Sequence, residues 1–269
     1  MHTPHTVSSL ASGQRATLRA IKAGNRVHAT VKSGVPIMVN FFSRSPQPVD
    51  CANCPLHRVD VMGDMPPEER AALLPFFRLR RFEPRDTVYS EGEAGASVGM
   101  VRRGLVKLVR CSASGDERIV RLAMAGDTIG LELMVGRAFE HTAIAVSAAE
   151  LCMMPLEVVE QRAECSPAFV RKLFAEWHAS VEEAERFLTE LSTGTAHQRV
   201  ARLLLFLHDR AHGGECPAIG REDMGALLGL TAETASRVVA EFKRAGQVRE
   251  DVHGRWHCDH EALGRVAER

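Results

Sequence analysis

The chain has 269 residues, enough for two domains, and its 45% hydrophobic and 25% charged residues are the balance of an ordinary soluble protein. The formal net charge is zero, which excludes a strongly basic protein but not a DNA-binding one, because a basic face can lie beside acidic segments. The sequence shows neither a signal-peptide core after Met1 nor an apolar run of the roughly 18 residues that a membrane span needs, so we expect a cytoplasmic protein without a membrane partner.

The first segments carry no sustained periodicity. Residues 1–45 mix Ser, Thr, Gly, His and Lys, and we expect them to form a flexible N-terminal extension. A short cysteine-bearing loop follows at 51–57, and then a helix over 66–77 that starts with prolines suited to a first turn. Together with the strands that come next, residues 46–165 are predicted to form a sensor domain.

Short strand-like runs alternate with glycine-containing turns between residues 79 and 155. The clearest runs are residues 87–89, 99–101, 105–111, 119–123 and 143–146. The turns that separate such runs contain Gly92, Gly104, Gly115 and Gly126. Many short strands at regular spacing predict a β-barrel or sandwich.

A helical period begins at about residue 167. Apolar residues then follow one another at alternating spacings of three and four, which is the a/d seam of a coiled coil, at Phe174, Trp177, Val181, Ala184, Leu188 and Leu191. Residues 166–193 are therefore predicted to form a dimerisation helix; the alternative is a helix that faces the core of its own domain. A further helix is expected over 196–209.

The segment 221–240 has the pattern of a helix-turn-helix. Such a motif needs a small residue where its helices cross and a glycine in the turn, and Gly225 and Gly229 stand at those positions. Thr231 suits the N-cap of the second helix, and residues 248–258 predict a wing. Residues 194–269 are thus expected to form a winged DNA-binding domain, although a helical hairpin that never touches DNA is the alternative.

The second helix of this motif would place its first residues in the major groove. Arg237 can donate two hydrogen bonds to guanine, Glu233 can accept one from cytosine, and Ser236 can contact either kind of base. Thr234 and Arg244 are better suited to holding phosphates.

At this point the sequence resembles the CRP/FNR superfamily of bacterial regulators, from about Cys51 to Arg265. The run Glu233-Thr-Ala-Ser-Arg237 is similar to the E-T/S-x-S-R recognition helix of the FNR branch. The resemblance implies an α+β fold: an N-terminal β jelly roll of the cyclic-nucleotide-binding type, a long dimerisation helix and a C-terminal winged helix-turn-helix. It also implies a homodimer on palindromic DNA with TTGAT-like half-sites, with RNA polymerase as a further partner.

Two kinds of ligand compete within this resemblance. The cyclic-nucleotide branch holds the phosphate with an arginine, and His141 stands at the comparable position here. A neutral imidazole would leave the phosphate charge largely unmatched, so we do not expect cyclic nucleotide binding.

The FNR branch instead holds a 4Fe-4S cluster through an N-terminal C-x2-C-x5-C run and one cysteine late in the barrel. Cys51 and Cys54 match the start of that run and Cys152 matches the late cysteine, but Asp60 stands where the third cysteine of the run is expected. An anionic carboxylate can bind iron, so the resemblance implies a cluster ligated by these four residues, with His57 as a weaker candidate. The alternatives are a redox dithiol or thiols without a role. The remaining cysteines are expected to be ordinary packing or surface residues (Cys111, Cys165, Cys216 and Cys258).

Our hypothesis for the mechanism is a switch in which oxygen or nitric oxide destroys the cluster, weakens the dimer and releases DNA. The alternative keeps the DNA-binding role, with haem, another small ligand or thiol oxidation as the signal; His57, His141 and His178 would be the candidate haem ligands. We do not expect an enzyme, because no nucleophile elbow, P-loop or dinucleotide fingerprint is present in the sequence.

Overall fold

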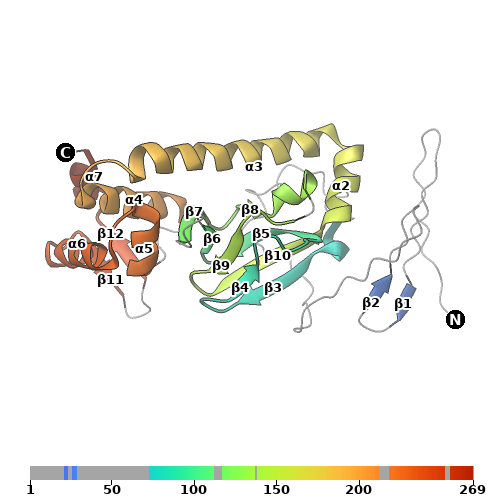
Figure 1. Ribbon diagram of the computed structural model, residues 1–269, viewed down its shortest axis with the longest axis horizontal. Coiled ribbons are helices and arrows are strands. Elements are labelled where there is room, and N and C mark those ends of the chain that lie inside the picture. The colour runs from blue at the N-terminus through green and yellow to red at the C-terminus, as the bar shows by residue number, and fades with distance from the viewer. Residues whose placement is uncertain are drawn as a thin grey trace. The chain divides into compact units, whose positions relative to one another are not determined.

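A computed structural model describes the backbone of residues 21–23 and 26–28, and residues 73–111, 117–136, 138–211, 218–251 and 255–268. The chain divides into two compact units, residues 1–45 and 46–269 (Figure 1). In the first unit, β1 (Ile21–Ala23) pairs antiparallel with β2 (Arg26–His28), inside the segment predicted to be flexible. The cysteine loop 51–57 lies outside the described residues. Of the helix expected over 66–77, the described end contains a short 3-10 turn, η1 (Leu74–Phe76).

Two antiparallel four-stranded sheets form the barrel of the second unit (Figure 1). The first sheet has the order β3-β10-β5-β8, with bounds β3 (Arg78–Phe82), β10 (Ala149–Pro155), β5 (Ser97–Arg103) and β8 (Thr128–Ile129). The second has the order β4-β9-β6-β7, with bounds β4 (Thr87–Tyr89), β9 (Thr142–Ala145), β6 (Val106–Cys111) and β7 (Glu117–Ala123). Each of the predicted runs lies in one of these strands within a residue or two, so the jelly-roll prediction is confirmed.

Three of the predicted turns contain a glycine with positive φ: Gly92, Gly104 and Gly126. The requirement is strongest at Gly104, where an added Cβ would lie 2.4 Å from the carbonyl oxygen of Ala148. Between β8 and β9 the chain forms a 3-10 turn, η2 (Leu131–Met134).

The helical region begins earlier than the sequence pattern indicated. A helix that was not predicted, α2 (Leu156–Cys165), follows β10 directly, and the long helix α3 (Pro167–Arg186) comes after it (Figure 1). Ser166 separates the two helices, because its side chain accepts the N–H of Phe169 as an N-cap and Pro167 occupies the first turn of α3. A π-helical turn, η3 (Phe187–Leu191), ends the long helix.

The C-terminal part contains the expected helices and a small antiparallel wing, with bounds α4 (Ala196–Arg210), α5 (Arg221–Leu228), α6 (Ala232–Arg244), β11 (Val248–Glu250) and β12 (Trp256–Cys258). A last helix, α7 (His260–Glu268), was not predicted. Among the described residues, no helix combines the length and apolar character that crossing a bilayer requires.

Two hydrophobic cores hold these elements together. The first core fills the barrel. Side chains of β6 point alternately into the two cores, with Leu108 in the first and Val109 in the second. The second core also contains Leu122 of β7 and buried residues of α4 and α5, including Leu204 and Met224. The barrel and the C-terminal helices therefore share one continuous apolar interface.

Candidate DNA-reading surface and sensor site

Two glycines set the angle between α5 and α6. A Cβ on the buried Gly225 would lie 2.7 Å from the carbonyl oxygen of Leu230, which is closer than side-chain carbons approach backbone oxygens. Gly229 ends α5 with a φ of +63°, in the left-handed region that glycine adopts without strain. Both predicted roles, the small residue at the crossing and the glycine of the turn, are confirmed.

The second helix of the motif is capped and locked as the sequence indicated. Thr231 Oγ1 accepts the backbone N–H of Thr234 at 3.1 Å, the geometry of an N-cap. On the inner face of α6, Ala235 and Val238 are almost fully buried in the second core. The helix is thus fixed by its buried face, and its opposite face is left open.

That open face carries the three residues predicted to read bases. Glu233, Ser236 and Arg237 are exposed, and spacings of three and four place them on one side of α6. Arg244 is also exposed, at the last turn of the helix, whereas Thr234 is half-buried with its hydroxyl 2.9 Å from Thr231 Oγ1. The structure therefore brings the candidate base-reading residues together on one convex surface.

Charged side chains next to this surface form ion pairs or hydrogen bonds with other elements and do not cover it. Lys243 pairs with Glu250 of β11 and lies 5.5 Å from the ring of Trp256, so it holds the wing against α6. The carboxylate of Glu241 contacts His197 Nε2 of α4 at 2.6 Å, and this hydrogen bond lowers the pKa of Glu241 below its ordinary value. Residues 252–254, at the tip of the predicted wing, lie outside the described residues.

The predicted seam of α3 is an unusually apolar surface stripe. Phe174 is 69% exposed, Leu188 is 72% exposed, and Trp177 and Val181 between them are more than 40% exposed, with Ala184 exposed as well. Monomeric proteins rarely leave such a stripe in water.

Leu191 does not belong to this stripe, so its assignment to a subunit interface is corrected. Its side chain is 2% exposed and packs in the second core of its own chain. The heptad spacing assumed a regular helix, but residues 187–191 form a π-helical turn, which takes more residues per turn and moves Leu191 off the seam.

The described residues contain one of the four proposed cluster ligands. Cys152 is 3% exposed on β10 and lines a cavity of about 30 Å³ together with Val159 of α2 and with Phe169 and Leu173 of α3. Cys51, Cys54, His57 and Asp60 lie outside the described residues. Within the described part of the chain, no group of three or more potential metal ligands comes together.

The stretch compared with the phosphate-holding turn contains an imidazole–carboxylate pair. His141 Nδ1 lies 3.8 Å from Glu132 Oε1. Burial of Glu132 would raise its pKa, but the imidazole and nearby backbone N–H groups outweigh burial and hold it below the ordinary value. Phe139 of the same stretch stacks on Tyr89 with 3.7 Å between ring centroids, and both rings are buried.

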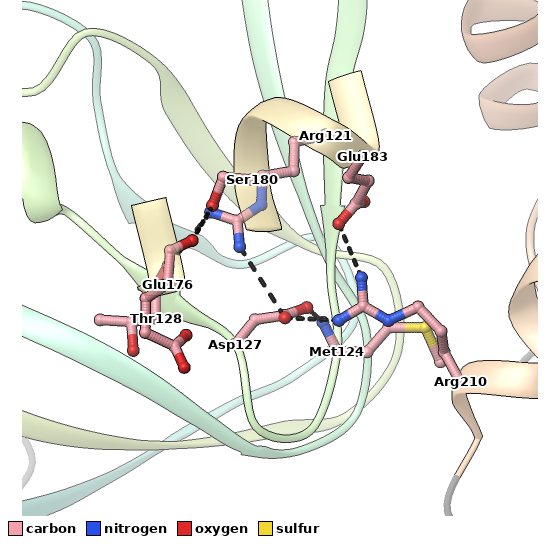
Figure 2. A network of polar contacts seen from close by, with 8 residues as sticks. All are labelled: Arg121, Met124, Asp127, Thr128, Glu176, Ser180, Glu183 and Arg210. Carbon is pink, nitrogen blue, oxygen red and sulfur yellow. Dashed lines mark hydrogen bonds and ion pairs between the residues drawn. The ribbon is translucent and has the colours of Figure 1, made fainter. Parts of the chain in front are cut away.

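Sequence reasoning missed one polar cluster at the junction of the barrel, α3 and α4. It contains Asp127, Glu183 and Arg210, of which the two carboxylates are almost fully buried (Figure 2). The local sequence offered no signal for it, because Glu183 and Glu185 both flank Ala184 of the seam and only Glu183 is buried.

Comparisons with known proteins agree with this architecture. The family model of the cyclic nucleotide-binding domain matches residues 79–164 and that of the Crp-like helix-turn-helix domain matches residues 198–266, together more than half of the chain. The transcriptional activator protein anr of Pseudomonas aeruginosa is 27% identical over 64% of this chain and 72% of its own. The transcriptional regulatory protein btr of Bordetella pertussis is 28% identical over 76% of this chain and 88% of its own.

Among solved structures, FixK2 from Bradyrhizobium japonicum superposes with a TM-score of 0.63 at 26% identity, over 70% of this chain and 96% of that one. These relatives are regulators and not enzymes. A barrel, a long helix and a helix-turn-helix with an open reading face recur in the same order in this chain. The protein is a DNA-binding transcription regulator and belongs to the CRP/FNR family.

Proposed function

We propose that the protein is a cytoplasmic homodimer that reads a palindromic DNA site and acts on RNA polymerase from there. The observation that carries the proposal is the open face of α6, where Glu233, Ser236 and Arg237 are exposed together while the opposite face, with Ala235, Val238, Val239 and Phe242, is buried. Their donors and acceptors suit guanine and cytosine edges in the major groove. Thr234 and Arg244 would contribute phosphate contacts.

The dimer follows from the apolar stripe on α3. Pairing of two such helices would bury Phe174, Trp177, Val181, Ala184 and Leu188 against the same residues of a second copy, as a two-fold interface requires. The two recognition helices would then enter successive major grooves about 34 Å apart.

For the signal we propose a 4Fe-4S cluster held by Cys51, Cys54, Cys152 and Asp60. The support for Cys152 as a ligand is its match to the late barrel cysteine and its place among apolar side chains, which would keep water from a bound cluster. The cavity beside it, about 30 Å³, is the size of one water molecule, so the barrel and α3 would have to separate there to admit a cluster. A bound cluster would supply a group that oxygen or nitric oxide can destroy. The same cavity is lined by Phe169 and Leu173 of α3, so a change at Cys152 would be felt directly by the helix that carries the seam.

DNA reading is tested by fluorescence anisotropy of a duplex with two inverted TTGAT half-sites against a scrambled duplex. We expect Arg237→Ala to weaken binding to the palindrome by about tenfold or more, as the loss of one bidentate base contact does. The matched control is Arg265→Ala, because Arg265 is also an exposed arginine of the same domain and, among the described residues, forms an ion pair with Glu261 of its own helix α7. Equal affinity of the unmodified protein for both duplexes would refute the proposed function.

The cluster is tested separately on protein purified without oxygen. We expect absorbance near 400 nm with matching iron and sulfide content, and loss of all three in Cys152→Ala. Asp60→Ala should change the Mössbauer spectrum of the bound iron if the carboxylate is a ligand. Absence of iron and sulfide would refute the cluster and leave DNA reading untouched, and a Soret band would identify haem in its place.

A further inference from the structure

Three elements that are distant in sequence meet at the side chain of Arg210, the last residue of α4 (Figure 2). Its Nη1 donates to Glu183 Oε2 on α3 at 2.6 Å, and its Nη2 donates to Asp127 Oδ1 in the turn between β7 and β8. We call these three residues the Arg210 clasp. One guanidinium thus joins the barrel, the long helix and the first helix of the DNA-binding domain.

The barrel end of the clasp is held rigidly. Asp127 Oδ2 accepts the backbone N–H of Met124 at 2.7 Å, and the carbonyl oxygen of Asp127 accepts the N–H of Val101 at 2.9 Å. Arg121 Nη2 lies 3.8 Å from Asp127 Oδ1 and adds a second cation. Asp127 therefore has one orientation, and it presents a fixed acceptor to α4.

Burial makes the clasp directional. Asp127 is 9% exposed and Glu183 is 6% exposed, so neither carboxylate can exchange its guanidinium partner for bulk water without a rearrangement. The contacts in the adjacent second core are apolar and therefore non-directional. They hold the barrel and the C-terminal helices together but allow small shifts of one against the other. Ion pairs with defined geometry are what fix register between packed surfaces.

The clasp also lies beside the proposed subunit seam. Glu183 neighbours Ala184 of the seam, while α4 leads through the second core to α5 and the reading helix. A second charged tether, Lys107 of β6 to Asp223 of α5 at 2.5 Å, joins the barrel to the helix-turn-helix itself. The position of α6 relative to the seam therefore depends on how α4 is held.

We propose that Arg210 is a positioning residue for DNA binding, because it fixes the DNA-binding domain against the long helix and the barrel and so sets the spacing between the two recognition helices of the dimer. The inference rests on the proposed function, in which a dimer reads a palindrome. According to this inference, Arg210 determines which half-site spacing the dimer prefers and does not itself contact DNA.

The experiment measures affinities for palindromes that share the same half-sites and differ in the base pairs between them, by anisotropy on the full chain. Two added base pairs increase the distance between the half-sites by about 7 Å and rotate one half-site relative to the other by about 70° around the DNA axis. We expect the unmodified protein to prefer its best spacing by about tenfold or more, and Arg210→Gln to lose most of that preference, with affinity for a single half-site unchanged. Arg210→Lys should restore part of the preference, because a lysine can keep one of the two pairs.

Controls separate the clasp from folding and from the proposed function. Arg265→Gln removes an exposed arginine of the DNA-binding domain that pairs with Glu261 on its own helix, and it should behave like the unmodified protein. If Arg210→Gln melts early, Asp127→Asn provides the same test while the pair between Arg210 and Glu183 remains. An unchanged spacing preference in a folded clasp variant would overturn the inference. A lack of palindrome preference in the unmodified protein would instead refute the dimeric DNA-binding function before any variant is compared.

Discussion

The crossing of α5 and α6 at Gly225 gives a quantitative test of the helix-turn-helix. In Gly225→Ala the new Cβ would lie 2.7 Å from the carbonyl oxygen of Leu230 and 3.3 Å from the backbone nitrogen of Ala232. Both neighbours are backbone atoms, so they cannot rotate away as a side chain would, and the helices must separate. Overpacking of this kind costs about 1–3 kcal/mol, which exceeds the gain of up to about 1 kcal/mol from replacing a helical glycine by alanine.

The matched control is Gly264→Ala on α7, where an added Cβ meets nothing within 4 Å. That variant should gain up to about 1 kcal/mol of stability, since only the propensity term applies. Urea unfolding followed by circular dichroism measures both variants, and Gly225→Ala should also weaken palindrome binding because α6 is displaced. Equal stability changes at the two positions would show that the crossing is not as tight as the structure indicates.

Three further outcomes are expected. Thr231→Ala should lower the free energy of unfolding by about 1 kcal/mol in urea melts, because the N-cap of α6 is lost. Leu188→Ser should dissociate the proposed dimer in analytical ultracentrifugation with little change in subunit stability, whereas Leu191→Ala should cost about 2–5 kcal/mol of stability because that side chain is buried in its own subunit. Burial raises the pKa of Glu183 against the opposing effect of Arg210, so the folded state keeps a proton that the unfolded state loses, and stability is lost as pH rises through that window. Glu183→Gln cannot ionise, so in urea melts at increasing pH above the ordinary pKa of a glutamate its stability should rise relative to that of the unmodified protein.

Local patterns in the sequence predicted most of the fold and of the reading surface. Glycine turns and strand-like runs indicated the barrel. The close helix crossing at Gly225, the positive φ of Gly229 and the N-cap of Thr231 each depend on contacts between residues a few positions apart in the sequence. These features are decided by backbone sterics and a local hydrogen bond, so no knowledge of distant packing was needed.

Features that depend on distant contacts could not be predicted in the same way. Leu191 fits the heptad by spacing, but its position is decided by a π-helical turn and by packing in the second core. The periodicity of the sequence shows neither of these. The Arg210 clasp joins residues up to 83 positions apart, and nothing in their local sequence distinguishes them from surface charges. The helices α2 and α7 were missed because each is short, at 10 and 9 residues, and a periodic pattern over so few residues does not identify a helix by itself.

The shared second core limits how a signal can travel from the barrel to DNA. Undocking the DNA-binding domain would expose Leu105, Val109, Ile119 and Leu122 of the barrel, each of which is almost fully buried in that core. At about 1.5–3 kcal/mol for each buried aliphatic side chain, exposing them would cost more than the roughly 5.5 kcal/mol that moves a two-state switch from one extreme to the other. The barrel and the reading helices of one subunit therefore stay docked, and directional contacts such as the Arg210 clasp set their exact register. In the proposed dimer, a signal near Cys152, where α3 lines the same cavity, would therefore act through the exposed seam of α3, by changing how the two subunits pair.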